Sequence, residues 1–217
     1  MRLGPALTLS ISTLMAGLVG LGIWLGSVER SSRIPVTLSP SGTVPLPVDG
    51  TAATLASQKT YVNKEDRYKF QYSKMVQITP RHETTGLSEV QVGYLHKGSN
   101  SVLGIRTYKT AEGVYHASNA QSLGEFIQAW VTSNDVREYH HTRLAGADSY
   151  EISALVPVHD APPERAVIIF SEAGGKLYEL FFPIGRGADT RPPPWRLLLD
   201  PMQREILSSF HFLSPSE

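Results

Sequence analysis

The chain has 217 residues, with 20 Lys and Arg against 20 Asp and Glu, and it contains no cysteine. This length predicts one folded domain with appendages. The balanced charge argues against a nucleic-acid binder, which needs a positive field to meet phosphates, and against a polybasic module of the membrane surface. The lack of cysteine excludes disulfide bonds, thiol catalysis and zinc–thiolate sites.

The first segment, residues 1–28, is predicted to be a single-pass transmembrane anchor. No charged residue occurs from Leu3 to Val28, and about 20 apolar residues in a helix already cross a ~30 Å hydrocarbon core. A cleaved signal peptide is the alternative. Its apolar region is shorter, roughly 7–15 residues, and Trp24 and Glu29 stand where small residues are needed for cleavage. We expect a cytoplasmic N-terminus and a domain outside the cytoplasm, in the periplasm or an equivalent compartment.

Gly22 and Gly26 form a GxxxG pattern inside this segment. Small residues at that spacing let two helix backbones approach closely in lipid. The simpler interpretation is that glycine is common in membrane helices. If the motif is functional, the anchor packs against a membrane partner through Gly22 and Gly26.

Residues 29–59 are predicted to be a linker, because four prolines stand among Ser, Thr and Gly and the apolar residues show no period. Such a composition cannot bury enough surface to offset the entropy of ordering. As a random coil, thirty residues reach about 30 Å. The domain can therefore range over a neighbour in the membrane.

Residues 60–217 are predicted to form an α+β domain that begins with a hairpin. Aromatic and polar residues alternate over 68–72, which places three rings on one face of a strand, and a polar turn at 64–66 precedes it. Alternation at 90–94 and apolar residues within 101–110 predict two more strands, joined by a turn at 97–100.

Two amphipathic helices follow from capping signals and periodicity. Ser122 and Glu125 match a capping box, in which the Ser hydroxyl accepts from the third amide and the Glu side chain reaches back to the cap amide. Asp200 followed by Pro201 starts the second helix. The apolar faces consist of Leu123, Phe126, Ile127, Trp130 and Val131, and of Met202, Ile206, Leu207 and Phe210.

Between these helices the pattern predicts strands at 137–143, 149–156, 166–171 and 176–183, with a hairpin turn at 172–175, and 210–213 can close the domain as a short strand. Short connections between consecutive strands predict an antiparallel sheet. The helices then have to bury their apolar faces on that sheet.

This pattern resembles the PsbP-like superfamily, named for an extrinsic protein of photosystem II, and the related bacterial envelope proteins of the DcrB type. The matching stretches are the aromatic strand 68–72, the helix start at 122–123, the glycine turn in 144–150, the strand 176–180 and the closing segment 206–210. The resemblance covers about residues 60–213. It implies an antiparallel sheet flanked by helices, a fold shared with a Ran-binding nuclear-import factor, and a non-enzymatic accessory or assembly role at a membrane complex.

The histidines do not predict a metal site. His140 and His141 are adjacent on a predicted strand, so their side chains point to opposite faces. His159 and Asp160, with Glu164 nearby, could bind a cation weakly, but a solvated turn is the favoured interpretation. No zinc-protease motif, phosphate loop or nucleophile elbow is present. We therefore expect no enzyme, no cofactor and no metal.

A proline-rich segment from Arg186 to Arg196 is the predicted partner-binding site. Three prolines hold it extended, and Arg191, Trp195 and Arg196 could anchor an interface. A rigid loop with Trp195 tucked into the core is nevertheless the favoured interpretation. The strand aromatics could likewise line a ligand groove, although core packing explains their alternation better.

The predicted function is that of an accessory or assembly subunit, anchored in the membrane, that binds a membrane protein complex. The alternative is a carrier or sensor of a small ligand, which requires a large apolar pocket between sheet and helix. An enzyme ranks third, because it needs a cleft with perturbed titratable groups.

Overall fold

A computed structural model describes residues 58–82, 86–94, 101–158, 161–186, 195–214 and 216–217. All of them belong to Val36–Glu217, the second of two units into which the chain divides. The predicted anchor with Gly22 and Gly26, and the linker as far as residue 57, lie outside the described residues. Within the described part, no helix is long and apolar enough to cross a membrane.

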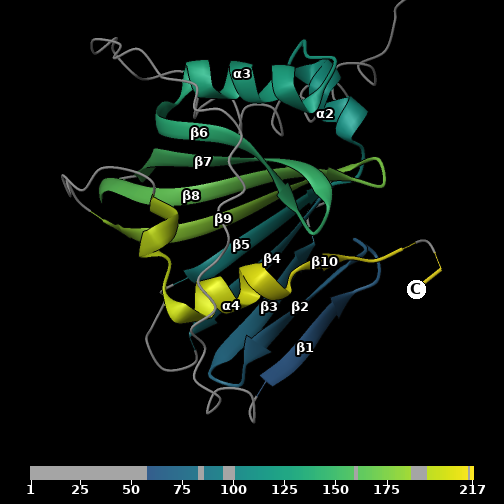
Figure 1. The fold of residues 1–217 in the computed structure, drawn as a ribbon, viewed down its shortest axis with the longest axis vertical. Helices are drawn as coiled ribbons and strands as arrows, with labels where there is room; N and C mark the ends of the chain where they lie inside the picture. Colours follow the sequence, from purple (N-terminus) through teal and green to yellow (C-terminus); the bar gives the residue numbers. More distant parts are fainter. Residues whose placement is uncertain (1–57, 83–85, 95–100, 159–160, 187–194, 215) are drawn as a thin grey trace, which may run out of the picture. The chain divides into compact units, whose positions relative to one another are not determined.

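The described elements are strands, two early helices, more strands and a closing helix (Figure 1). In chain order they are β1 (Gln58–Asn63), β2 (Tyr68–Ser73), β3 (Val76–His82), β4 (Leu87–Tyr94), β5 (Ser101–Tyr108), α2 (Ala111–Ala117), α3 (Leu123–Ser133), β6 (Asp135–Leu144), β7 (Ala147–Val158), β8 (Ala161–Ala173), β9 (Lys176–Arg186), the 3₁₀ turn η3 (Trp195–Leu198), α4 (Pro201–Ser209) and β10 (His211–Phe212).

The strands form two antiparallel sheets. One has three strands in the order β1-β2-β10, and the other has seven in the order β3-β4-β5-β9-β8-β7-β6. Antiparallel sheets with a few helices confirm the predicted α+β class. The sequence predicted one sheet, whereas the first hairpin pairs with β10 in a sheet of its own. The pairing of β2 with the last strand leaves no local signal in the sequence.

The order of the large sheet explains where the helices lie. The chain leaves β5 in the middle of the sheet and must re-enter at β6, the far edge. Helices α2 and α3 make this crossing over one face of the sheet, in the region of β6 to β9. Helix α4 and the small sheet lie on the opposite face (Figure 1).

Strand β8 of the large sheet is therefore buried on both faces. On β8, Val167 and Ile169 belong to the core shared with the small sheet and α4, while Ile168 and Phe170 belong to the core under α2 and α3. Strands buried on both faces read as continuous apolar runs rather than alternating ones. The uninterrupted run 166–170 has this character.

Two hairpin turns of the large sheet use left-handed backbone. Gly174 and Gly175 between β8 and β9 have φ of 58° and 74°, and Ala145 and Gly146 between β6 and β7 have φ of 48° and 86°. Two consecutive residues with positive φ are typical of the two-residue hairpin turn that matches the twist of the strands. Both turns lie where the sequence predicts them.

The helix caps agree with the prediction in one case and differ in part in the other. Asp200 and Gln203 form a complete capping box at α4. At α3, Ser122 Oγ accepts from the Glu125 amide at 3.3 Å as expected, but the Glu125 carboxylate accepts from the Gln121 amide, one residue before the cap. The predicted reciprocal bond to the cap amide is therefore wrong.

The two edge strands of the large sheet differ in composition. Pro80 lies within β3, and proline has no backbone N–H. Strand β6 has a register shift between Val136 and Glu138, and its sequence, DVREYHHTRL, is rich in charged residues and histidine.

A buried carboxylate lies in the middle of the large sheet. Glu179 on β9 is 8% exposed and is the cross-strand neighbour of Arg106 on β5, whose Nη1 lies 3.3 Å from Glu179 Oε1. Tyr108 donates to the other carboxylate oxygen at 3.2 Å. Burial raises the pKa of Glu179 above its ordinary value, and Arg106 and Tyr108 oppose that rise.

This pKa shift predicts a pH dependence of stability. Between the unfolded pKa, about 4.3, and the raised folded pKa, the folded state binds more protons than the unfolded state. The contribution of Glu179 is therefore complete below about pH 4.3 and is lost as the pH rises through the folded pKa. We expect Glu179→Gln to remove this part of the slope of unfolding free energy against pH, measured by urea denaturation at stepped pH.

Glu65→Gln, at an exposed position of the β1–β2 turn, is the matched control and should keep the wild-type slope. A Glu179→Gln protein that follows the wild-type pH curve would contradict the assignment.

Candidate functional site

The turn η3 carries two of the three residues predicted for partner binding. Trp195, its first residue, is 3% exposed and belongs to the core shared with the small sheet and α4. This placement agrees with the favoured interpretation of a Trp tucked into the core. Arg191 lies outside the described residues, and Arg196 is partly exposed.

Arg196 ties η3 to the large sheet. Its Nη1 lies 2.5 Å from Oε2 of Glu151 on β7, a residue that is 2% exposed. Burial raises the pKa of Glu151, while Arg196 and then His140 oppose the rise. Because a buried carboxylate without a partner is costly, Arg196 is committed to Glu151 and contributes mainly its remaining exposed surface to any interface.

The other end of η3 is fixed through the start of α4. Asp200 caps the helix and also accepts a hydrogen bond from the Tyr94 hydroxyl at 2.7 Å. Burial, followed by this hydrogen bond, raises the pKa of Tyr94 to about 12, so the hydroxyl keeps its proton as the donor. The turn is thus held by a buried indole, an ion pair and a helix cap.

Leu197, at the centre of this fixed turn, is 70% exposed. Among the described residues it is the most exposed of the large apolar side chains, followed by Met75 at 63% and Val62 at 45%. Sequence reasoning missed Leu197 because it lies among Trp195, Leu198 and Leu199, and nothing in their spacing marks it as the exposed one. A 3₁₀ helix has about three residues per turn, so Trp195 and Leu198 lie on one side of it and Leu197 lies on another.

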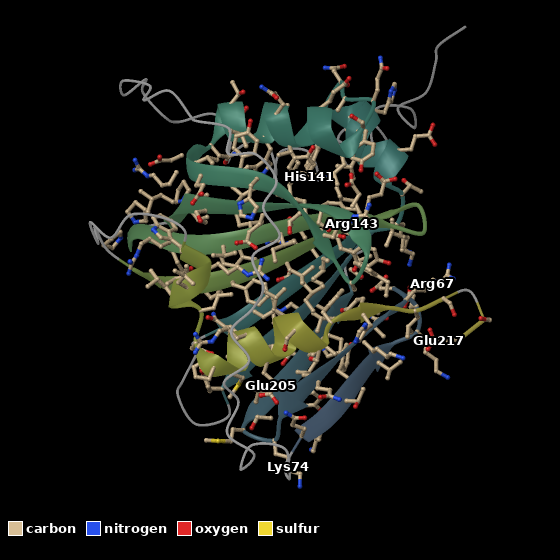
Figure 2. The ribbon with its side chains drawn as sticks, viewed as in Figure 1. Arg67, Lys74, His141, Arg143, Glu205 and Glu217 are labelled. Atoms are coloured by element: carbon tan, nitrogen blue, oxygen red, sulfur yellow. The ribbon has the colours of Figure 1, made fainter. Side chains whose placement is uncertain are left out.

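His140 and His141 have different neighbours, as predicted for adjacent residues of a strand. Nε2 of His141 lies 2.5 Å from Asp148 Oδ1, and its ring meets that of Tyr150 at a centroid distance of 5.1 Å. His140 is instead the cross-strand neighbour of Glu151. Figure 2 shows His141 and Arg143 near one another on β6.

The part of the chain that the structure describes holds no group of three metal-binding side chains. Of the weak cation site considered from the sequence, His159 and Asp160 lie outside the described residues, and Glu164 is half-buried on β8.

The strand aromatics pack in the core, as favoured from the sequence. Tyr68, Phe70, Tyr178 and Phe182 are each at most 1% exposed. Tyr68 stacks on Phe210 at 5.4 Å and meets Tyr178 edge-on at 6.2 Å. These rings connect the small sheet to the large one and do not line an open groove.

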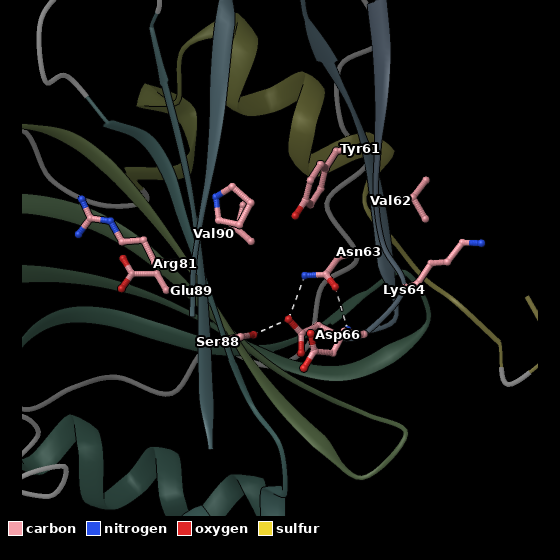
Figure 3. Close-up of a pocket in the computed structure, with 11 residues that line it drawn as sticks. Tyr61, Val62, Asn63, Lys64, Asp66, Arg81, Ser88, Glu89 and Val90 are labelled. Atoms are coloured by element: carbon pink, nitrogen blue, oxygen red, sulfur yellow. Dashed lines mark hydrogen bonds between the residues drawn. The ribbon is translucent and has the colours of Figure 1, made fainter. Parts of the chain in front are cut away.

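A cleft of about 300 Å³ opens between the β1–β2 hairpin and strands β3 and β4. In Figure 3, Tyr61, Asn63 and Asp66 point into the space from the hairpin, and Ser88 meets Asp66 from the opposite wall. The cleft lies between two sheets, rather than between sheet and helix as the carrier hypothesis expected. No sequence motif indicated it, because its walls are far apart in the chain.

The carboxylate of Asp66 organises the floor of this cleft. It is 2% exposed, accepts from Asn63 Nδ2 at 2.9 Å and from the Ser88 hydroxyl, and lies 3.5 Å from Lys176 Nζ. The Asp66 carbonyl also accepts from the Tyr178 hydroxyl at 2.7 Å. This network joins the hairpin turn to β4 and β9.

Comparisons with known proteins give neighbours in fold. No family model and no curated protein matches the chain. The solution structure of cyanobacterial PsbP (CyanoP) from Synechocystis is 15% identical, with a TM-score of 0.48, over 81% of this chain and 98% of that one. A crystal structure from Bacteroides thetaiotaomicron is 11% identical, with a TM-score of 0.41, over 73% of this chain and 50% of that one.

The first of these neighbours is a PsbP protein, and the residue pattern of this chain resembles that family. The likeness concerns the fold alone.

The burial of Trp195 predicts the effect of its removal. We expect Trp195→Ala to lower the free energy of unfolding by about 3–5 kcal/mol, because the substitution leaves a cavity in the core. The matched variant Leu197→Ala, two residues along, should change it by less than about 0.5 kcal/mol. Urea denaturation followed by circular dichroism measures both, and equal losses would show that Leu197 is packed.

Proposed function

We propose that this chain is a non-enzymatic accessory or assembly subunit, anchored in the membrane by residues 1–28, that binds a membrane protein complex through its folded unit outside the cytoplasm. The observation that carries the proposal is Leu197, a large apolar side chain 70% exposed on a turn fixed at both ends. The contact surface consists of Leu197, the exposed part of Arg196 and the proline-rich segment that contains Arg191.

A fixed turn suits binding because its conformational entropy is already lost on folding and is not lost again on association. Immobilising a flexible side chain or loop on association costs about 0.5–1.5 kcal/mol per side chain. Complete burial of a leucine contributes roughly 1.5–3 kcal/mol, so Leu197 retains most of that gain for a partner. Arginine is enriched in interfaces, and the stem of Arg196 can pack while its guanidinium stays with Glu151.

The N-terminal segment supports the placement of this surface. About 26 uncharged residues exceed the length that crosses a bilayer, and a linker of about thirty residues gives a reach of roughly 30 Å. A tethered unit meets its partner at high effective concentration, so a modest contact surface is sufficient.

The contact surface can be tested with a pair of matched variants. Leu197→Asp should abolish recovery of the partner when the tagged full chain is purified from membranes in mild detergent, because a charge replaces the apolar contact. Met75→Asp makes the same change at a position 63% exposed on the β2–β3 turn. This control should retain the partner in wild-type stoichiometry.

Thermal unfolding should be unchanged in both variants, which separates lost binding from lost folding. Recovery of the same partner by Leu197→Asp and wild type would overturn the assignment of the surface.

The anchor is tested by fractionation of the full chain. We expect the protein to remain in the membrane pellet after high salt and alkaline carbonate and to be released by detergent, because a spanning helix is held by its apolar area rather than by charge. Release by carbonate, or a mature N-terminus near residue 30, would contradict the proposed anchor.

A further inference from the structure

We propose that the cleft between the β1–β2 hairpin and β3–β4 binds a compact cation, an ammonium or guanidinium group on a short apolar stem. The site is separate from the turn η3 and does not rest on the proposed function. Its chemistry follows from the hydrogen-bonding groups at the floor, the walls that surround them and the volume enclosed.

The floor is rich in acceptors and has few donors left. The Asn63 amide donates to Asp66 and to the Tyr68 hydroxyl, and the Ser88 hydroxyl donates to Asp66. These donors are therefore already used. An ionised carboxylate offers about four acceptor positions, and Asp66 receives two side-chain hydrogen bonds at normal length or shorter, with Lys176 at 3.5 Å. A ligand that enters must therefore bring donors.

The charge of the site favours a donor that is also a cation. Lys176 approaches Asp66 only to 3.5 Å, whereas charge-assisted N–H···O bonds are typically about 2.7–2.9 Å. The two cations among the lining residues, Lys64 and Arg81, point away from the space between the walls (Figure 3). Lys176 is therefore within ion-pair distance of Asp66, but it lies farther away than a charge-assisted hydrogen bond and leaves room for a closer cation.

The walls offer an aromatic face and an apolar surface. The ring of Tyr61 borders the space on one side, and Pro80 and Val90 line the other. Tyr61 is half-buried, and its ring centroid lies 5.3 Å from that of Phe70. A guanidinium or ammonium group is attracted to such a ring when it lies within about 6 Å of the ring centroid.

The volume limits the ligand to a small molecule or one side chain. At about 30 Å³ for each water-sized group, a space of about 300 Å³ holds roughly ten non-hydrogen atoms. Agmatine, a guanidinium group on a four-carbon stem that ends in an amine, has this size and is a suitable probe.

Isothermal titration of the full chain in mild detergent tests the inference. We expect agmatine to bind with one-to-one stoichiometry and at least tenfold more tightly than 4-aminobutylurea, which keeps the stem, the terminal amine and the shape of the guanidinium group without the guanidinium charge. This comparison requires no mutation and is independent of folding. Equal affinity for the two probes, or no saturable binding of agmatine up to about 10 mM, overturns the proposal.

Two variants then locate the bound probe. Asp66→Asn should weaken agmatine binding at least tenfold, and Thr60→Ala, exposed on the same hairpin and outside the cleft, should leave it unchanged. Thermal unfolding of Asp66→Asn confirms that the protein is folded. Should it fail to fold, Tyr61→Leu replaces it and should also weaken binding. Tight agmatine binding to a folded Asp66→Asn or Tyr61→Leu protein counts against this site.

The source of the cation is resolved by an end-blocked Gly-Arg-Gly peptide. Tighter binding of the peptide than of agmatine assigns the cleft to an arginine side chain of a protein. The opposite order assigns it to a free amine.

Discussion

The large sheet must bury side chains on both of its faces over β7, β8 and β9, and most other features of the unit depend on that requirement. Ile168 and Phe170 need a cover on one face, and Val167 and Ile169 need one on the other. The crossing from β5 to β6 supplies α2 and α3 as the first cover. The first hairpin, α4 and β10 supply the second, which brings the two ends of the described chain together in one small sheet.

Two carboxylates lie within this doubly covered region, one on each face. Glu151 contacts Arg196 and Glu179 contacts Arg106, and burial raises the pKa of both. Loss of one partner of a buried ion pair typically costs about 3–5 kcal/mol, although the intact pair adds little to stability. The pairs therefore act as constraints on arrangement: the one on β7 determines where η3 sits, and with it the exposure of Leu197.

The sequence predicted the elements whose signals are local and strong. The aromatic hairpin, the capped helices α3 and α4 and the two glycine turns all combine periodicity with a specific cap or turn residue. Strand β3 was missed because its alternation is limited to Val76 and Ile78 before Pro80, a residue that is rare inside strands. Helix α2 was missed because it has only seven residues and contains Gly113, a poor helix former.

The candidate sites were harder to predict, because they depend on contacts between distant residues. Trp195 was a candidate interface residue for which core packing was the favoured interpretation, and the core takes the indole and leaves Leu197 outside. The Asp66 network joins residues up to 112 positions apart, and no spacing in the chain marks it. Long-range packing decides which side chains remain exposed for binding, and periodicity does not encode it.

The outermost strands of the large sheet have a consequence for how the protein meets others. Pro80 interrupts the row of amide donors on β3, and the displaced register and dense charge of β6 oppose a flat approach on the other side. Both edge strands of the large sheet thus disfavour pairing with a strand of another chain. The large sheet can stay discrete among close neighbours for this reason, and association through these two edge strands must use side chains rather than a shared backbone ladder.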